Sequence, residues 1–328
     1  MTIYIVSSGG GHTGYAIAVA EALFELNEYM DIKFIVDPFD KWSIMRIRKR
    51  IVNPKYVYVS KPRNPLESFS KLLARIPVSL IESLINIEKP EAIIATGSNH
   101  SITPILAGLV KKAKLLISIE AVDRIHTYSI ANKKLHDYVK IPIALHWIEQ
   151  LKNYSRGFVT GPIYEKPLYK TEDHGFILVL TGSMGHLKLI KLLLETDLDD
   201  VVIQSGKVEP SFITSKKPHW RVFRFDPDID YWISKASVVL GHQGLSIVEA
   251  ALSYRKPVIL VYNPDLPQTS GLIDSILLAE KLNGLFINPD EVKPSELVEA
   301  IEKVKKEKPF EYGNGSLKLA KIVIDSIS

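Results

Sequence analysis

One arrangement of residues occurs twice in this 328-residue chain: an apolar strand, then a glycine-rich turn, then a helix. The first copy reads TIYIV followed by SSGGGHTGYAIAVAEAL, and the second reads FILVLTGSMGHLKLI. β-Branched and aromatic residues predict a buried strand before each turn, and apolar residues at helical spacing predict a helix after it. Such β-loop-α units predict a parallel sheet covered by helices, which places the chain in the α/β class.

Strand and helix patterns alternate along the rest of the chain in the same way. We predict strands at residues 2–6, 32–36, 56–59, 91–96, 115–120, 141–145, 157–160, 176–180, 201–204, 221–225, 238–240 and 258–262. Helical patterns cover residues 79–88, 101–113, 187–196, 229–236, 245–255 and 272–282. The sequence therefore predicts two doubly wound, Rossmann-like parallel-sheet domains that face a central cleft.

Polar, glycine and proline residues interrupt this alternation in the stretch GPIYEKPLYKTEDHG. The chain is long enough for two domains, each with its own core. We predict an N-terminal domain over residues 1–163, a linker over 164–175, a C-terminal domain over 176–312 and a C-terminal helix over 313–328.

Both glycine turns have the chemistry of phosphate or sugar-phosphate sites. Gly9, Gly10 and Gly11 can adopt positive φ, and without side chains they let an anion approach the helix N-terminus. The spacing is neither G-x-G-x-x-G nor a P-loop, so a purely structural tight turn is the alternative. A turn does not require an imidazole at its tip, and His12 therefore favours a ligand site. The corresponding residues of the second turn are Gly182, Ser183, Gly185 and His186.

Composition excludes several kinds of site. The chain has no cysteine, so disulfides and thiolate catalysis are excluded and zinc would depend on His and carboxylate ligands. Three acids, Asp226, Asp228 and Asp230, lie between a predicted strand and a predicted helix, where Asp caps helices. Four histidines lack metal-ligand spacing: His126, His136, His146 and His174. We predict no metal site.

Basic residues are concentrated between Lys41 and Arg75, where ten Lys or Arg face a single acid, Glu67. This segment carries +9 of a chain whose net charge is +4, so the remainder sums to −5. Because apolar and aromatic residues are interleaved with the charges, we predict docking on an anionic membrane surface. Nucleic-acid binding and a solvated helix face are the alternatives. No apolar run reaches the roughly 18 residues of a membrane span, and no signal sequence is evident, so we expect a cytosolic location.

Four segments resemble glycosyltransferases of the GT-B fold, in the group of MurG and the eukaryotic two-subunit transferase that adds the second GlcNAc to dolichol pyrophosphate. SSGGGHTG with AVAEAL resembles their N-terminal loop and helix, and LTGSMG resembles the turn of their second domain. ASVVLGHQGLSIVEAALSYRKPVILV is similar to their nucleotide-sugar segment. LLISIEAVDRIHTYSIANKKL is similar to the membrane-associated subunit of the dolichol enzyme, as if the two eukaryotic subunits were joined.

This resemblance implies a set of donor-binding residues. Glu249 matches the ribose-binding glutamate in a Ser-x-x-Glu pattern that begins at Ser246, although the same pair also predicts a helix capping box. Gly244 lies one residue nearer the glutamate than in the relatives, and Gln243 stands where their glycine is expected. Gln268, in NPDLPQTSG, is the nearest candidate for the family's donor-sugar glutamine. The predicted donor set also includes Gly182, Ser183, Gly185 and His242.

Transfer requires a base for the acceptor hydroxyl, and His12 is our candidate because a near-neutral pKa suits that role. Glu120, at the end of another predicted strand, either orients that imidazole or is itself the base. A histidine that caps its own helix is the alternative. The predicted acceptor or phosphate contacts are Gly9, Gly10, Gly11, Thr13, Asn99 and His100.

The resemblance implies an inverting, metal-independent and cofactor-independent transferase. It would move GlcNAc or a related sugar from a UDP-sugar to a polyprenyl- or dolichyl-pyrophosphate-linked sugar, peripherally attached to the cytosolic face of a membrane through Lys41 to Arg75. We expect no nucleic-acid partner. The alternatives are a UDP-GlcNAc 2-epimerase or glycolipid synthase of the same fold, or a noncatalytic binder of sugar nucleotides or nucleic acid.

Overall fold

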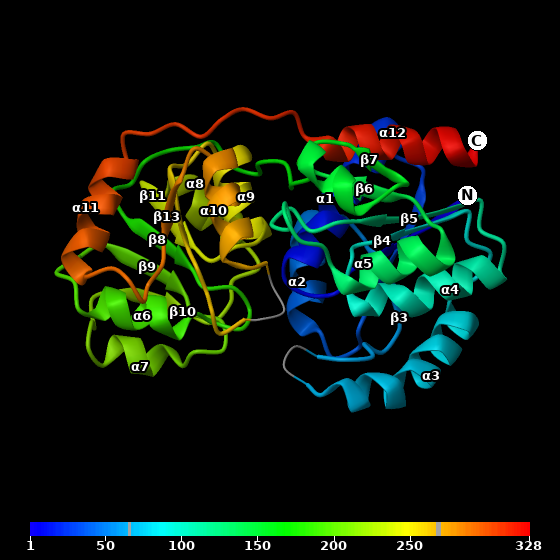
Figure 1. The fold of residues 1–328 in the computed structure, drawn as a ribbon, viewed down its shortest axis with the longest axis horizontal. Helices are drawn as coiled ribbons and strands as arrows, with labels where there is room; N and C mark the ends of the chain where they lie inside the picture. Colours follow the sequence, from blue (N-terminus) through cyan, green and yellow to red (C-terminus); the bar gives the residue numbers. More distant parts are fainter. Residues whose placement is uncertain (65–66, 267–269) are drawn as a thin grey trace. The chain divides into compact units, whose positions relative to one another are not determined.

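The computed structural model describes residues 1–64, 67–266 and 270–328 (Figure 1). The chain forms two compact units, one of residues 1–165 with 313–328 and the other of residues 166–312. Each unit is built around one parallel sheet with helices on its faces (Figure 1).

The first unit contains a seven-stranded sheet in the order β3-β2-β1-β4-β5-β6-β7. Its strands are β1 (Thr2–Val6), β2 (Asp31–Val36), β3 (Lys55–Tyr58), β4 (Ala92–Ala95), β5 (Leu115–Ile119), β6 (Ile143–Leu145) and β7 (Gly157–Val159). Its helices are α1 (Gly11–Leu26), α2 (Lys41–Arg50), α3 (Phe69–Asn86), α4 (Ile102–Val110), α5 (Ile130–Lys134) and α12 (Gly315–Ile327), with short turns η1 (Asn99–Ser101), η2 (Leu135–Val139) and η3 (Ile148–Asn153). The central strands are apolar on both sides because helices cover both faces.

The second unit contains a six-stranded sheet in the order β10-β9-β8-β11-β12-β13. Its strands are β8 (Ile177–Leu180), β9 (Val201–Gln204), β10 (Arg221–Phe223), β11 (Val238–Gly241), β12 (Val258–Val261) and β13 (Leu285–Ile287). Its helices are α6 (Leu187–Leu194), α7 (Pro210–Thr214), α8 (Ile229–Lys235), α9 (Leu245–Leu252), α10 (Leu272–Lys281) and α11 (Pro294–Val304). Both sheets thus have the doubly wound order that the sequence predicts.

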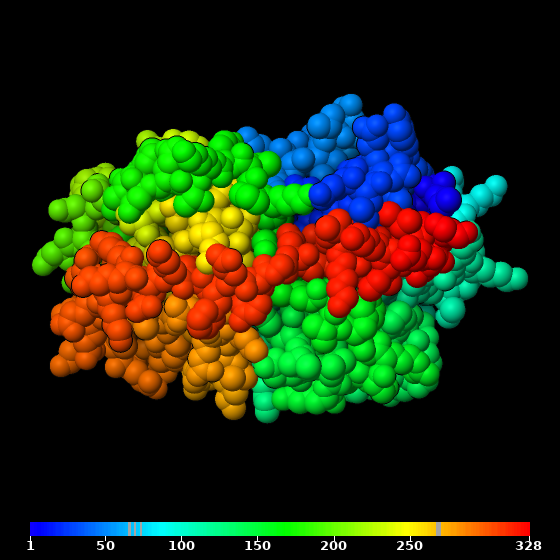
Figure 2. Space-filling view, turned by 90° about the horizontal axis from the view of Figure 1, so that it is seen from above, coloured from blue at the N-terminus to red at the C-terminus, as the bar shows by residue number. Residues whose placement is uncertain are grey.

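The C-terminal helix α12 packs on α1 of the first unit, where Figure 2 shows the end of the chain lying along its beginning. The Gly315 amide donates to the Pro162 carbonyl at 2.7 Å, and the Asn314 side chain donates to the Tyr164 carbonyl at 2.6 Å. A Cβ at Gly315 would lie 2.3 Å from the Gly161 oxygen, so only glycine permits this approach.

Residues 166–175 pack on the second unit, although we expected them to be part of a linker. The Lys256 ammonium donates to the carbonyls of Glu172 at 2.5 Å and Ala236 at 2.6 Å, and the Leu168 amide donates to the Tyr254 hydroxyl at 2.9 Å. Helix α3 begins at Phe69 and continues through Pro77, ahead of the predicted start. The predicted strands do not include β13 (Leu285–Ile287).

In each sheet the strand order reverses at one point, between β1 and β4 in the first unit and between β8 and β11 in the second. The loops that follow these strands leave the same carboxyl edge of their sheet because all the strands are parallel. Ligands of doubly wound sheets bind at this switch point. The two glycine turns are the loops after β1 and β8, so each lies at the switch point of its own unit.

Candidate functional site

The first glycine turn owes its shape to positive φ values of 86° at Gly9 and 51° at Gly10, the N-cap residue of α1. The amides of His12 and Thr13 donate to the carbonyls of Gly9 at 3.2 Å and Gly10 at 3.1 Å. Those two amides are therefore committed within the turn. An anion at this turn would meet the other loop amides and the side chains around them.

His12 lies where the loops after β1 and β4 meet, with its ring Nδ1 2.5 Å from the carbonyl oxygen of Thr96. A carbonyl oxygen only accepts, so Nδ1 carries the proton and Nε2 presents its lone pair. Nε2 has no hydrogen-bond partner in the described part of the chain. Burial and the nearby Lys61 cation lower the pKa of His12 to about 4, although the Thr96 contact and Asp123 oppose the shift. The imidazole is therefore neutral at neutral pH and able to accept a proton, but it is a weaker base than the near-neutral pKa expected from the sequence implies.

His12 does not cap its own helix, so that alternative is wrong. Helix α1 has Gly10 as its N-cap residue and no side-chain cap. The second turn differs, because His186 is the N-cap of α6 and its Nδ1 accepts from the Leu189 amide at 3.4 Å. Burial lowers the pKa of His186 to about 3. The two histidines therefore occupy corresponding sequence positions with different roles.

The predicted contact between Glu120 and His12 is wrong. The Glu120 carboxylate is fully buried and accepts from the amides of Ala121 at 2.7 Å and Ser129 at 3.1 Å, from the Ser129 hydroxyl at 2.8 Å, and from the Tyr154 hydroxyl. These four donors hold the loop after β5. Because they occupy the carboxylate, the geometry favours His12 over Glu120 as the base, and that choice stays a prediction.

Two of the predicted acceptor contacts are side chains of the core. His100 is 0% exposed, its Nε2 lies 2.8 Å from the Val59 carbonyl, and burial lowers its pKa to about 4. The Thr13 hydroxyl is buried between the hydroxyls of Ser7 at 3.0 Å and Ser43 at 2.7 Å. Both side chains are therefore enclosed within the first unit rather than exposed to a ligand. Asn99 is half-buried and donates to the Arg63 carbonyl at 3.3 Å.

The second unit brings the residues of its glycine turn together with those of the loop after β11. Gly182 has a φ of 70°, and a Cβ there would lie 2.2 Å from Nε2 of His242, so glycine lets the imidazole pack on the turn. The Asn263 amide group donates to the Gly185 carbonyl at 3.2 Å, which ties the end of β12 to the same turn. Ser183 is exposed. Sequence reasoning missed Asn263, whose role depends on this cross-loop contact.

Helix α9 presents the predicted ribose-binding residue. Its N-cap is Gly244, with no side-chain cap, so the alternative capping box of Ser246 and Glu249 is wrong. Ser246 is exposed, whereas Glu249 is 6% exposed on the inner side of the helix. Gln243 spans the neighbouring loops, since it donates to the Ser270 carbonyl at 3.2 Å and accepts from the Asn263 amide at 3.1 Å. Gln268 lies outside the described residues.

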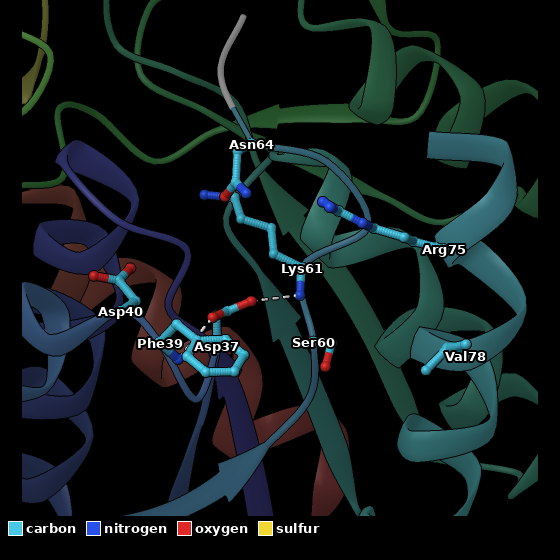
Figure 3. A pocket seen from close by; sticks show the side chains of 8 residues that line it. All are labelled: Asp37, Phe39, Asp40, Ser60, Lys61, Asn64, Arg75 and Val78. Atoms are coloured by element: carbon cyan, nitrogen blue, oxygen red, sulfur yellow. Dashed lines mark hydrogen bonds between the residues drawn. The ribbon is translucent and has the colours of Figure 1, made fainter. Parts of the chain in front are cut away.

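A pocket of about 550 Å³ opens in the first unit beside the glycine turn (Figure 3). Its lining comes from the ends of β2 and β3 and from α3: Asp37, Phe39, Asp40, Ser60, Lys61, Asn64, Arg75 and Val78. The pocket adjoins Gly9, because a Cβ there would lie 3.1 Å from Oδ2 of Asp40 and 3.7 Å from Nζ of Lys61. The sequence analysis did not single out Lys61, which is one of ten basic residues in its segment.

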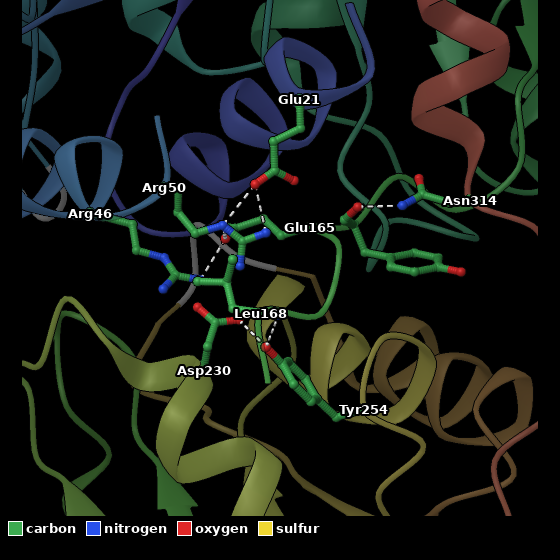
Figure 4. A network of polar contacts seen from close by, with 9 residues as sticks. Glu21, Arg46, Arg50, Glu165, Leu168, Asp230, Tyr254 and Asn314 are labelled. Atoms are coloured by element: carbon green, nitrogen blue, oxygen red, sulfur yellow. Dashed lines mark hydrogen bonds and ion pairs between the residues drawn. The ribbon is translucent and has the colours of Figure 1, made fainter. Parts of the chain in front are cut away.

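The basic segment is less available to a membrane than its charge implies. Arg46 and Arg50 are buried in ion pairs within the first unit: Nη2 of Arg46 lies 2.5 Å from Glu165, and Nη2 of Arg50 lies 2.7 Å from Glu21 (Figure 4). Lys55 is paired with Asp31 at 2.5 Å. Distant acids thus neutralise part of the charge of Lys41 to Arg75, and docking of this segment on an anionic membrane stays a prediction.

The described residues contain no group of three or more His, Asp or Glu side chains suited to a metal ion. The carboxylate of Asp226 accepts from the Asp228 amide and from the Trp232 indole, each at 2.9 Å. Asp230 accepts from the Tyr254 hydroxyl at 2.6 Å (Figure 4). Asp228 is the N-cap residue of α8, but its side chain forms no cap hydrogen bond. The acidic string thus fixes the loop before α8 through Asp226 and ties α8 to Tyr254 through Asp230.

Residues 176–323 match the glycosyltransferase family 28 C-terminal domain. Curated relatives are the UDP-N-acetylglucosamine--N-acetylmuramyl-(pentapeptide) pyrophosphoryl-undecaprenol N-acetylglucosamine transferases of Thermotoga sp. strain RQ2, 26% identical over 94% of each chain, and of Thermotoga maritima, 25% identical over 99% of each chain. One similar solved structure is Acinetobacter baumannii MurG, which is 15% identical over 99% of each chain with a TM-score of 0.63. Another is the Neisseria meningitidis UDP-GlcNAc 2-epimerase bound to UDP-GlcNAc, which is 14% identical over 100% of this chain and 99% of that chain, with a TM-score of 0.64. The structural likenesses establish the fold as GT-B.

Proposed function

We propose that this chain of the GT-B fold is a MurG-like glycosyltransferase that transfers GlcNAc from UDP-GlcNAc to a sugar carried on a polyprenyl or dolichyl diphosphate. The observation that carries this proposal is the geometry of His12. Its proton is fixed on Nδ1 by the Thr96 carbonyl, and its Nε2 is open at the switch point beside a glycine turn. This is the state that a general base needs before it meets a hydroxyl.

In the proposed reaction, the acceptor hydroxyl attacks C1 of the donor sugar in a single displacement. The new bond joins that oxygen to C1, the bond from C1 to the diphosphate oxygen breaks, and Nε2 of His12 takes the hydroxyl proton. UDP leaves with the bonding electrons, and one displacement inverts the configuration at C1. The Gly185 amide donates to the Gly182 carbonyl at 3.3 Å, and the other amides of the second glycine turn are suited to the negative charge that develops on the diphosphate.

The donor site that we propose belongs to the second unit. Glu249, buried on α9, is suited to accept hydrogen bonds from the two ribose hydroxyls, and the packed pair of Gly182 and His242 forms the floor for the diphosphate. The family 28 match over residues 176–323 supports this assignment, as does the UDP-GlcNAc transferase activity named for the Thermotoga relatives.

The test is an assay of UDP release. The purified protein is incubated with UDP-GlcNAc, with and without a GlcNAc-diphosphate lipid or a MurNAc-diphosphate lipid, and UDP and the glycolipid are quantified. We expect UDP release that depends on one of these acceptors, with stoichiometric lengthening of its glycan. UDP release without acceptor, accompanied by epimerised free sugar, would instead identify a 2-epimerase. Sugar-nucleotide binding without turnover would favour a noncatalytic binder.

The state of His12 predicts the pH profile of kcat/KM. Since the base acts as the neutral imidazole and its pKa is lowered to about 4, activity is lost only as the pH falls through that value. The charged groups facing the ring are Lys61 and Arg124, which lower its pKa, and Asp123, which raises it. We expect the acidic limb of kcat/KM to lie near pH 4, measured from initial rates in constant-ionic-strength buffers. An acidic limb in the usual histidine range would contradict the buried, cation-adjacent setting.

No helix within the described residues is both long and apolar enough to cross a bilayer. The membrane contact that we propose is an apolar face of α3 formed by Val78, Ile81 and Ile85, which are 52%, 57% and 67% exposed. These residues share one side of the helix because they are spaced by three and four positions. The opposite side packs on α4, where the Ser79 and Thr103 hydroxyls lie 2.7 Å apart.

We expect the double variant Ile81→Ser/Ile85→Ser to lose most of its binding to vesicles that contain acidic lipids, because the interface gains about 25 cal/mol per Å² of buried apolar surface. Vesicle co-sedimentation measures this loss. The matched control is Tyr29→Ser, because Tyr29 is a highly exposed residue outside both α3 and the basic segment, and this variant should bind as wild type does. Equal loss in the control, or unchanged binding in the double variant, would contradict docking through α3.

A further inference from the structure

Lys61 has an ammonium group that the protein only partly satisfies. Its Nζ donates to the Ser8 carbonyl at 2.5 Å, and it forms no ion pair among the residues that the structure describes. Burial lowers the pKa of Lys61, and the charges of Asp40 and Asp37 offset this only in part. An ammonium has three N–H donors, so two remain for a ligand. An anion at Nζ would supply the partner that burial has removed.

The acids that line the same pocket are already occupied. Asp40 accepts from the Ser43 amide at 3.1 Å and from the Ser43 hydroxyl at 2.7 Å, as the cap of α2. Asp37 accepts from the Phe39 amide at 2.8 Å and from the Lys61 amide at 2.7 Å (Figure 3). Both carboxylates therefore shape the loops, and the ammonium of Lys61 faces the pocket beside the glycine turn.

We propose that Lys61 binds the diphosphate of the lipid-linked acceptor at the mouth of the first glycine turn, an inference that rests on the proposed function. A diphosphate is the ligand chemistry because it offers several acceptor oxygens to an ammonium and to glycine-turn amides together. UDP carries the same group. The acceptor is favoured because the pocket belongs to the first unit, whereas Gly182, His242 and Glu249 belong to the second.

The lining of the pocket also connects Lys61 with the proposed membrane contact of the lipid-linked acceptor. Val78 borders the pocket and belongs to the exposed apolar face of α3 together with Ile81 and Ile85. The proposed membrane contact is thus continuous with the pocket that contains Lys61. A prenyl chain following α3 would bring its diphosphate to Lys61 and the attached sugar toward the turn that carries His12.

The test is titration calorimetry with inorganic pyrophosphate as the probe, in the presence of saturating UDP so that the donor site is filled. Lys61→Gln keeps an N–H donor for the Ser8 carbonyl but removes the charge. We expect pyrophosphate to bind about tenfold or more weakly to this variant, and Lys61→Arg to restore most of the affinity. The matched control is Lys114→Gln, because the Lys114 ammonium also donates to a backbone carbonyl, that of Ile327 at 2.9 Å.

Three results would overturn the inference. Unchanged pyrophosphate affinity in Lys61→Gln would show that Lys61 does not bind a diphosphate. An equal loss of UDP affinity, measured separately without pyrophosphate, would assign the residue to the donor. An equal loss in Lys114→Gln would show a nonspecific charge effect. Thermal melting of each variant confirms folding, and Lys61→Met, which also removes the charge, replaces Lys61→Gln in the comparison if the latter unfolds. The binding result does not depend on turnover, so a failed transferase assay and a failed Lys61 assignment are distinguishable.

Discussion

His12→Ala should lower kcat by about 10²–10⁴-fold, the range typical of a lost general base, while UDP binding stays within about twofold of wild type. The ring touches the first unit through the Thr96 carbonyl, whereas the proposed ribose and diphosphate contacts of UDP lie in the second unit. The substitution therefore removes proton transfer and leaves the nucleotide contacts in place. Single-turnover rates and UDP calorimetry, measured on the same preparation, separate the two effects.

A second substitution distinguishes the base from a merely structural imidazole. In His12→Asn the side-chain amide can still donate to the Thr96 carbonyl, but it has no basic nitrogen. We expect it to be as slow as His12→Ala with a melting temperature near that of wild type. His126→Ala, at an exposed histidine of the same unit, serves as the matched control. A rate within a few-fold of wild type in both His12 variants would remove His12 from the mechanism.

The parallel sheets and their switch points were predictable because they depend on local pattern. Each central strand is a continuous apolar run, and each glycine turn follows such a run directly. These features depend on residues that are close together in the sequence, and a parallel sheet places the following loops at one edge. The strand β13, LFI, was not predicted, although β6, β7 and β10 are equally short and were predicted.

The roles of polar residues at strand ends were less predictable, because their hydrogen-bond partners are distant in sequence. Glu120 and His12 both follow buried strands, yet Glu120 is held by Ser129 and Tyr154 while His12 is held by Thr96. The type and position of a side chain show that it lies near the carboxyl edge. They do not show which neighbour takes its hydrogen bonds, and that choice separates a base from a loop anchor.

The ion-pair partners of the basic segment were unpredictable for the same reason, since they are distant in sequence. A local count treats Arg46, Arg50 and Lys61 alike, but Arg46 is paired with Glu165 from the other end of the unit, and Lys61 reaches the carbonyl of Ser8. Sequence counting gives the sum of the charges, whereas folding decides which of them stay available. Lys61, the cation most relevant to the site, therefore could not be distinguished in the sequence from the other basic residues of its segment.

Glu249→Ala should weaken UDP binding by about 1–3 kcal/mol, or roughly 5- to 150-fold, because it removes two charge-assisted hydrogen bonds to the ribose. The capping box that offered a purely structural role is absent, since α9 begins after Gly244 and Ser246 is exposed in its first turn. We therefore expect the melting temperature of the free protein to fall little. Ser246→Ala is the matched control on the same helix and should leave that temperature unchanged.

Calorimetry with UDP and with its 2′,3′-dideoxyribose analogue locates the interaction. Glu249→Ala should weaken the binding of UDP but not that of the analogue, because only UDP carries the hydroxyls that donate hydrogen bonds to the carboxylate. If both nucleotides lost affinity equally, or if only the melting temperature changed, Glu249 would be a packing residue of α9 and the ribose contact would have to lie elsewhere in the second unit.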